Sequence, residues 1–339
     1  MIREIINAIR KANRIAILPH VSADGDALGS SLALGLALKR IGKDIRVYIE
    51  EKIPMIYDML PGQDMLVVYG NGCIADADDE SGSIDCRGEK DGNNMAFDLA
   101  IAIDTGDVER LGKRVSIFDT AQNSVNIDHH HTNTEFAGIN YVDTQASAVG
   151  EIVYQLIKDM GLEMDADIST SLYVAISTDT GGFRYSNTTP ATHRIAADLV
   201  NNGIDVAEIS QKVFDSTTFS KVRLMGETIS SLELLNDGKV AFSAITKDKM
   251  EKLGATEEDC DGLVNIGRNI VGVEVSVFLR QKQDGSVKAN LRSKNYVDVA
   301  AVAKMFGGGG HKRAAGFTSE EGIEDVRDKV LNVIGEMLK

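Results

Sequence analysis

The chain alternates short apolar runs with longer segments in which apolar residues recur at helical spacing. Several short runs are apolar at nearly every position, as in strands that are buried on both faces of a sheet. The segment 27–42 instead spaces its apolar and small residues three or four positions apart, which predicts a helix that ends near Gly42. Strands are predicted at 14–20, 44–50, 65–70, 98–104, 115–120 and 124–130. This alternation predicts an α/β fold with a largely parallel sheet and helices on both faces.

The pattern changes further along the chain. Helices are predicted at 147–161, 167–183, 189–203 and 217–235, after which alternating apolar and polar positions return. There the residues QDGS at 283–286 separate two alternating runs, which is a hairpin signal. We therefore expect a domain over 1–190, a helical connector over 191–235 and a smaller α+β domain over 236–339. We expect the active site in the cleft between the two domains, since ligands bind at the carboxyl ends of parallel strands.

Composition and charge limit the kinds of molecule that the protein is expected to bind. The chain has 339 residues, of which 43% are apolar and 26% charged, as in a globular protein that works in the cytoplasm. No apolar run is long enough for a membrane span, and residues 1–14 lack the apolar core of a secretory leader. The formal charge is 36 minus 51, or −15, which argues against binding to long nucleic acid or anionic membrane. The stretch 280–313 is the exception, with eight basic and two acidic residues, and is a candidate for anion binding.

Two features carry no assigned function. The acidic, Gly- and Ser-rich segment 71–97 interrupts the strand pattern and is predicted to be a surface insertion. A disordered loop is favoured there over a lid or a partner-binding loop. The three cysteines form no C-x-x-C pair, so free thiols are favoured over a disulfide between Cys73 and Cys86.

Ionisable residues collect where strands and one helix are predicted to end. Four separate segments contribute them: His20, Asp24 and Asp26; Asp104; Asp128, His129 and His130; and Asp179. Taken singly, each has an ordinary structural explanation, such as a turn, a helix cap or a solvated histidine. Together they would place several carboxylates at one sheet edge, where their repulsion needs an offset. Four Asp and two neutral His around two divalent cations come close to neutrality, and such paired metals catalyse phosphoryl displacement.

The ordered motifs also resemble a known family. HVSADGDALGS at 20–30, AIDTGD at 102–107, IDHHHTNT at 127–134, STDTGGF at 177–183 and GGGGH at 307–311 resemble those of the DHH phosphoesterases. The resemblance implies that two Mn²⁺ ions, with Mg²⁺ or Co²⁺ as alternatives, are bound by His20, Asp24, Asp26, Asp104, His129 and Asp179. It further implies that Asp128 supports the metal site and that His130 is the catalytic histidine. His131 receives no role.

The last motif bears on the substrate. Four glycines leave backbone N–H groups open to an anion, and Gly307, Gly308, Gly309, Gly310 and His311 resemble the substrate-binding motif of the family's C-terminal domain. There Arg292 and Ser293 match residues that contact substrate phosphate and the terminal nucleotide. The chain is similar to the compact two-domain oligoribonucleases, or nanoRNases. These hydrolyse very short RNA to 5′-mononucleotides, and many convert 3′-phosphoadenosine 5′-phosphate to AMP.

Three alternatives to this function stay open. One is a phosphodiesterase specific for linear dinucleotides such as pApA, another is a phosphatase for 3′-phosphoadenosine 5′-phosphate alone, and the third is a non-catalytic nucleotide sensor. A homodimer is compatible with the sequence. The charge of −15 agrees with a pocket for two or three nucleotides, because a long basic track is not needed for them.

Overall fold

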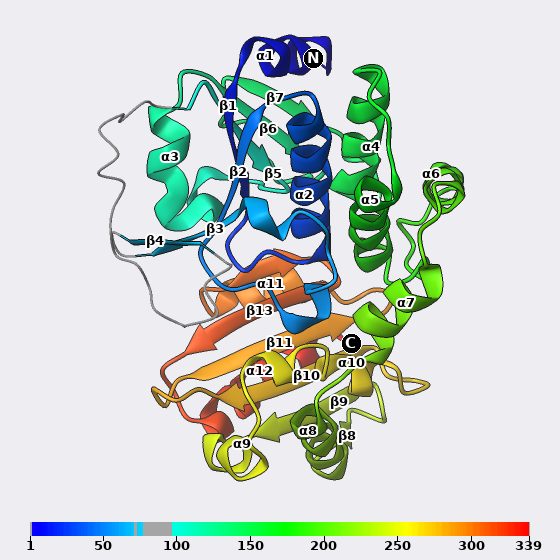
Figure 1. The fold of residues 1–339 in the computed structure, drawn as a ribbon. Coiled ribbons are helices and arrows are strands. Elements are labelled where there is room, and N and C mark those ends of the chain that lie inside the picture. The colour runs from blue at the N-terminus through cyan, green and yellow to red at the C-terminus, as the bar shows by residue number, and fades with distance from the viewer. Residues whose placement is uncertain (1, 71–72, 77–96, 339) are drawn as a thin grey trace. The chain divides into compact units, whose positions relative to one another are not determined.

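The structure, a computed structural model, describes residues 2–70, 73–76 and 97–338 (Figure 1). The chain divides into two compact units, Met1–Ser216 and Thr217–Lys339. The division falls inside 191–235, the segment for which the sequence predicts a helical connector. Most of the predicted insertion 71–97, and with it the alternative disulfide of Cys73 with Cys86, lies outside the described residues.

The first unit is built on a sheet with the order β4-β3-β2-β1-β5-β6-β7. Its strands are β1 (Arg14–Pro19), β2 (Asp44–Ile49), β3 (Leu66–Gly70), β4 (Cys73–Asp76), β5 (Leu99–Ile103), β6 (Ser124–Asp128) and β7 (Ile139–Val142). All neighbouring pairs are parallel except β3 with β4. The largely parallel sheet predicted from the sequence is confirmed.

Helices cover both faces of this sheet (Figure 1). One face packs against α1 (Ile2–Lys11), α2 (Gly25–Arg40), α4 (Val149–Asp159) and α5 (Ala166–Asp179), and the other against the 3₁₀ segment η3 (Val108–Arg114) and α3 (Val115–Thr120). Side chains alternate accordingly: Ile15 and Ile17 belong to the first core, whereas Ala16 and Leu18 belong to the second. This explains why the strand sequences are apolar at nearly every position.

Shorter helical segments complete the first unit. They are η1 (Met55–Tyr57), η2 (Gln63–Met65), α6 (Pro190–Asn201), α7 (Val206–Ser210) and the π-helical turn η4 (Gln211–Asp215). The 147–161, 167–183 and 189–203 helix predictions correspond to α4, α5 and α6.

One strand prediction is wrong. The segment 115–120 forms the helix α3, in which Phe118 is buried and the Thr120 hydroxyl donates to the carbonyl of Ser116 one turn earlier. The reason lies in the topology, because β5 and β6 are parallel neighbours and must be joined by a crossover that leaves the sheet. Conversely, β7 was not predicted, since its residues are all only partly buried and lack a clear apolar pattern.

The second unit is α+β, as predicted. Its sheet has the order β12-β13-β11-β10-β9-β8 and pairs β10 with β9 in parallel but with β11 antiparallel, across the predicted QDGS turn. The strands are β8 (Glu233–Leu235), β9 (Val240–Ile245), β10 (Val275–Gln281), β11 (Val287–Ser293), β12 (Gly309–His311) and β13 (Ala314–Ser319).

The helical elements of this unit are α8 (Phe219–Ser230), α9 (Lys247–Leu253), η5 (Glu258–Cys260), α10 (Val264–Arg268), α11 (Val299–Met305) and α12 (Ile323–Met337). Cys260 is a buried free thiol. Among the residues that the structure describes, no helix has the length and apolarity that a membrane crossing requires.

Candidate metal centre and phosphate-binding strands

Three adjacent strands deliver ionisable residues to one edge of the first sheet. His20 directly follows β1, Asp104 directly follows β5, and Asp128 is the last residue of β6, with His129 and His130 behind it. Because β1, β5 and β6 are parallel neighbours, their carboxyl ends lie side by side. The sheet order therefore gathers side chains that lie up to 110 positions apart in the sequence (20 to 130).

Two helices add the remaining carboxylates. Asp24 caps the N-terminus of α2 by accepting from the backbone N–H groups of Asp26 and Ala27, both at 3.1 Å. Asp179 is the last residue of α5. These helix ends meet because glycines of α2 let the two backbones approach closely: a Cβ added at Gly29 would lie 2.4 Å from the Ser171 carbonyl oxygen.

The resulting cluster consists of overlapping groups whose ligand atoms lie within 4.8 Å of one another. They are Asp104 with His129 and His130, His20 with Asp24 and Asp104, and Asp26 with His129 and Asp179. The Nε2 atom of His129 lies 3.7 Å from an oxygen of Asp104 and 3.7 Å from an oxygen of Asp179. The structure thus brings together all six residues that the family resemblance implies as metal ligands.

The two innermost imidazoles are held in one tautomer. Nδ1 of His20 donates to the carbonyl of Val21 at 2.7 Å, and Nδ1 of His129 donates to the carbonyl of Ala146 at 3.1 Å. In the neutral ring this leaves the Nε2 lone pair facing carboxylate oxygens. Burial would lower the pKa of His129, but the charges of Asp26 and Asp179 raise it, so Nε2 in this position requires a cation, either a proton or a metal ion. The orientation of both rings fits metal ligation.

Asp104 shows the same need for a cation. Its carboxyl group is buried, and within the described part of the chain Oδ1 has no hydrogen-bond donor. The residue also has a left-handed backbone with φ of 55°. Burial, reinforced by the charges of Asp26 and Asp24, raises the pKa of Asp104 well above its usual value. An unpaired buried carboxylate is costly, which makes this oxygen the natural position for a divalent ion.

Asp26 and Asp179 share this environment. Burial and then the charge of Asp179 raise the pKa of Asp26 to about 7, although its carboxylate accepts from the backbone N–H groups of Val149 and Gly150 at the start of α4. Burial also raises the pKa of Asp179 to about 6. The raised values indicate that negative charge is concentrated here beyond what the side chains themselves can neutralise.

Asp128 and His130 form a separate pair beside the cluster. Asp128 is fully buried and accepts from His130 Nδ1 at 2.7 Å and from Asn133 Nδ2 at 2.6 Å. Burial by itself would raise the pKa of Asp128, but the hydrogen bond and charge of His130 and the hydrogen bond from Asn133 together lower it. The carboxylate therefore stays charged and fixes the ring of His130, whereas His131 is exposed.

Two residues that support the site, Asn133 and Arg114, were not predicted from the sequence. Asn133 bonds to the carboxylate of Asp128 and also to Asn126 Oδ1 at 2.8 Å; its place in the motif IDHHHTNT was the available signal. Arg114 is fully buried, and its Nη1 donates to the carbonyls of Pro19 and Tyr48 at 2.9 and 2.7 Å. It braces the end of β1 just before His20, and nothing in the sequence pattern indicates this role.

In the second unit, Arg292 and His311 share one row of the sheet. Both register with Ala314 of β13, Arg292 from β11 and His311 from β12. Side chains in one lateral row point to the same face, and the residue between these two is the small Ala314. Ser293 is the next residue along β11, so it points to the opposite face, where it is buried and donates to the carbonyl of Val297 at 2.7 Å.

Two glycines of the run 307–310 are required by close backbone packing, which the sequence pattern does not indicate. A Cβ at Gly308 would lie 2.3 Å from the Gly316 carbonyl oxygen, and one at Gly310 would lie 2.5 Å from that of Ala314. Both glycines therefore let the run pass close against β13. A Cβ at Gly307 or at Gly309 would meet no atom within 4 Å among the described residues, so these two backbones are the open ones.

The fold and the site define a class: an α/β protein with a candidate metal centre at the carboxyl edge of its sheet, followed in the chain by an α+β unit in which Arg292 and His311 share one row of the sheet. The chain belongs to the DHH family. The model of the DHH family N-terminal domain matches residues 14–176, and that of the DHHA1 domain matches residues 237–339.

Similar proteins extend over the full length. A Thermus thermophilus protein named bifunctional oligoribonuclease and PAP phosphatase NrnA is 33% identical over 340 residues, which cover 100% of this chain and 94% of that protein. A Bacillus subtilis protein of the same name is 28% identical, covering 92% and 91%. A crystal structure of an exopolyphosphatase-related protein from Bacteroides fragilis matches with a TM-score of 0.89 at 28% identity, covering 99% and 97%.

Proposed function

We propose that this protein hydrolyses short oligoribonucleotides to 5′-mononucleotides and removes the 3′-phosphate of 3′-phosphoadenosine 5′-phosphate to give AMP. As a DHH phosphoesterase it is a hydrolase of phosphoester bonds. The observation that carries the proposal is the buried Oδ1 of Asp104, which has no hydrogen-bond donor among the described residues and lies among three imidazoles and three further carboxylates. The names of full-length relatives support the choice of substrate.

Two Mn²⁺ ions would be held by His20, Asp24, Asp26, Asp104, His129 and Asp179, with Mg²⁺ or Co²⁺ as alternatives. Four carboxylates and two neutral imidazoles carry −4, which two divalent ions cancel. Such ions polarise the scissile phosphoryl group and lower the pKa of a bound water to near 7, by roughly nine units in the best-known zinc case. Neutral imidazoles locked with Nε2 inward by Val21 and Ala146 support this ligand set.

His130 would act on the reacting phosphoryl group. Asp128 accepts from its Nδ1, so Nε2 is the atom available to the substrate. Held in this orientation by Asp128, the His130 ring would act as a general acid–base group toward a phosphoryl oxygen or the leaving ribose oxygen. Asn133 keeps Asp128 in place through its second carboxylate oxygen.

The second unit would bind the phosphate end of the substrate. Arg292 and His311, on one row of the sheet, offer donors on one face, and the flat fork of an arginine can bind two phosphate oxygens. Gly307, Gly308, Gly309, Gly310 and the buried Ser293 would shape the loops around these two side chains. A cytoplasmic location and a homodimer belong to the same proposal.

Product analysis tests the proposal. The protein with Mn²⁺ is given a 5′-phosphorylated RNA dinucleotide, a labelled RNA 24-mer, 3′-phosphoadenosine 5′-phosphate and pyrophosphate side by side. We expect rapid conversion of the dinucleotide to mononucleotides and release of AMP from the adenosine bisphosphate, with the 24-mer nearly untouched. Hydrolysis of none of them by protein with bound metal would contradict the proposal and favour a nucleotide sensor.

A further inference from the structure

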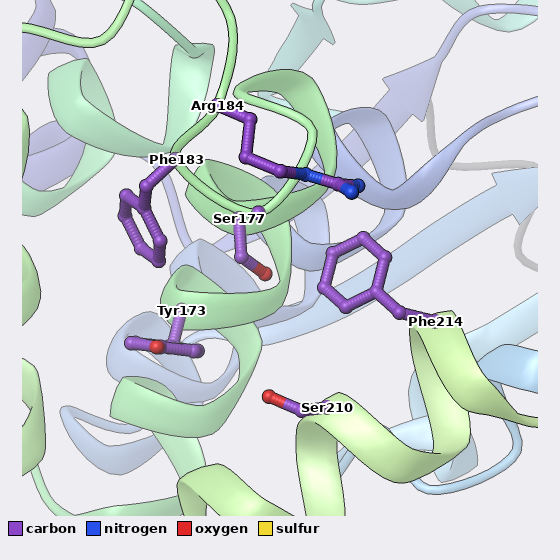
Figure 2. A pocket seen from close by; sticks show the side chains of 7 residues that line it. Tyr173, Ser177, Phe183, Arg184, Ser210 and Phe214 are labelled. Atoms are coloured by element: carbon purple, nitrogen blue, oxygen red, sulfur yellow. The ribbon is translucent and has the colours of Figure 1, made fainter. Parts of the chain in front are cut away.

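A pocket of about 230 Å³ lies in the first unit beside the turn that follows Asp179 (Figure 2). Its labelled lining residues are Tyr173 and Ser177 of α5, Phe183 and Arg184 of the following turn, Ser210 of α7 and Phe214 of η4. None of these is a candidate metal ligand, and no acidic side chain lines the pocket. It combines one cation with several aromatic rings.

Arg184 is anchored at one end and open at the other. Its backbone N–H donates to the carbonyl of Thr180 at 2.9 Å, and its Nε donates to the carbonyl of Gly181 at 2.6 Å. Within the described ranges no carboxylate lies within ion-pair distance of its guanidinium. Figure 2 shows the guanidinium extending toward the side of the pocket that holds the Phe214 ring. A planar cation with its terminal amino groups unpaired binds anions and stacks on flat rings.

The aromatic walls are fixed in uncommon conformations. Phe214 is 40% exposed and belongs to the π-helical turn η4, a rare geometry that recurs at functional sites. Phe183 has a left-handed backbone with φ of 63°, which is strained for a residue with a bulky side chain. Its ring stacks on His193 at 5.5 Å and meets Tyr173 at 5.7 Å. Backbone strain of this kind persists only where the surrounding packing fixes the residue, and it is common at binding sites.

The pocket is tied to the candidate metal centre through one rigid turn. The side chain of Asn187 donates to the carbonyl of Asp179 at 3.2 Å and to that of Ser147 at 3.0 Å. The backbone N–H of Gly182 donates to the carbonyl of Ser177 at 2.7 Å. Arg184 is therefore held by the same hydrogen-bonded turn that begins at Asp179, five residues earlier.

We propose that this pocket is a base-binding subsite, in which Phe214 stacks on one nucleobase of the substrate and Arg184 contacts the same ring or its adjoining phosphate. The inference rests on the proposed function and extends it by naming what recognises the base. Aromatic walls, a guanidinium without a carboxylate partner among the described residues and a lining without acidic side chains suit a planar base joined to phosphate. A phosphate alone would leave the rings without a contact.

Abasic substrates test the subsite. The protein with Mn²⁺ is given the dinucleotide pApA and two analogues that lack the base at the first or at the second position. We expect one analogue to be hydrolysed with a kcat/KM about 5- to 150-fold lower than that of pApA. This is the loss expected when a single base no longer stacks on an aromatic side chain. Phe214→Ala and Arg184→Met should lower kcat/KM for pApA toward that of this analogue, and Phe214→Tyr should restore it.

Two variants outside the pocket are matched controls: Phe219→Ala removes another exposed ring, and Arg46→Met another exposed arginine. If Phe214→Ala hydrolyses pApA at the wild-type rate, the subsite is overturned while the proposed function stands. An equal loss on pApA and on both analogues would also overturn it, since base recognition would then not be involved. If the wild type hydrolyses none of these and no 3′-phosphoadenosine 5′-phosphate, the proposed function itself fails.

Discussion

At the scale of single residues, the candidate centre is a set of groups that do not satisfy one another. His20 and His129 donate Nδ1–H to backbone carbonyls and turn Nε2 toward carboxylate oxygens. Asp104 keeps an oxygen buried without a donor among the described residues. Each arrangement costs free energy in the metal-free protein and is relieved by a cation. The geometry is that of a site prepared for metal at the expense of stability.

Replacing His130 and replacing its neighbour His131 should have different effects on kcat. His130→Ala removes the side chain that Asp128 orients, so kcat for the dinucleotide should fall by about 10²- to 10⁴-fold. Mn²⁺ content, measured by elemental analysis, should survive because the six proposed ligands remain. His131→Ala is the control, since His131 is exposed and should leave kcat unchanged. A His130→Ala enzyme with wild-type turnover would refute the assigned role.

Asp104→Asn should stabilise the metal-free protein. The pKa of Asp104 is raised in the fold, so its favourable contribution is complete below the ordinary carboxyl pKa and is lost as pH rises through the raised value. Asparagine cannot ionise and tolerates a left-handed backbone. With chelator present, the melting temperature of the variant should match the wild type near pH 4 and exceed it at pH 8, by roughly 2–4 °C per kcal/mol.

Mn²⁺ should reverse the order of the two melting temperatures, so that the wild type becomes the more stable protein. Mn²⁺ stabilises the wild type by binding only the folded chain, and it competes with protons on Asp26 and Asp179, whose pKa values are about 7 and about 6. The Mn²⁺-induced rise in melting temperature should therefore grow between pH 5 and 8 and be smaller in Asp104→Asn. An increment that is independent of pH would argue against these carboxylates as ligands.

At the scale of elements, the contact between α2 and α5 aligns the two helix ends that carry carboxylates. The N-terminus of α2 holds Asp24 and Asp26, and the C-terminus of α5 holds Asp179. Gly25 and Gly29 face Thr178 and Ser171 at distances that no side chain could occupy. The separation of the helices, and with it the span of the candidate centre, is thus set by the absence of two side chains.

Gly29→Ala should destabilise the protein although alanine favours helices. The added Cβ would lie 2.4 Å from the Ser171 carbonyl oxygen, and forcing the helices apart should cost about 1–3 kcal/mol. Gly226→Ala in α8 is the matched control, because a Cβ there meets no atom within 4 Å and should stabilise by about 0.4–1 kcal/mol. Denaturant unfolding measures both, and a stabilised Gly29→Ala protein would contradict the packing argument.

At the scale of the whole molecule, charge is divided between the two units. The formal charge of the chain is −15. The buried acids of the candidate centre, which are included in this count, lie in the first unit, whereas the basic stretch 280–313 lies in the second. An anionic substrate would be repelled by the metal-free cluster, so under the proposed function it would be bound by the cations together with Arg292 and His311. Each unit would hold part of the machinery, as the two family matches over 14–176 and 237–339 suggest.

Arg292→Met should separate substrate binding from metal binding. We expect KM for pApA to rise about 10- to 100-fold, equivalent to about 1.4–2.7 kcal/mol, because a charged donor to phosphate is lost. The Mn²⁺-induced rise in melting temperature should be unchanged, since Arg292 belongs to the other unit. Steady-state kinetics and thermal unfolding read the two effects independently. A loss of the metal effect would show that Arg292 acts on the first unit.

The sequence by itself determined much of this protein. Apolar runs buried on both faces predicted the parallel sheet, and Asp and His residues at strand ends predicted the cluster, because parallel strands end at one edge. Spacing along the chain also identified the hairpin between β10 and β11. These features depend on local pattern, or on a rule that holds for any sheet of this type.

Only the tertiary structure decided the rest. The segment 115–120 has a strand-like composition but forms a helix, since the crossover between β5 and β6 leaves no neighbour for it. Arg114 braces the end of β1 and Asn133 holds Asp128 through contacts with residues that no local pattern connects to them. The orientation of His20 and His129 rests on carbonyls supplied by the fold. Hydrogen-bond partners and close backbone approaches are properties of a packed chain, and the order of residues alone does not contain them.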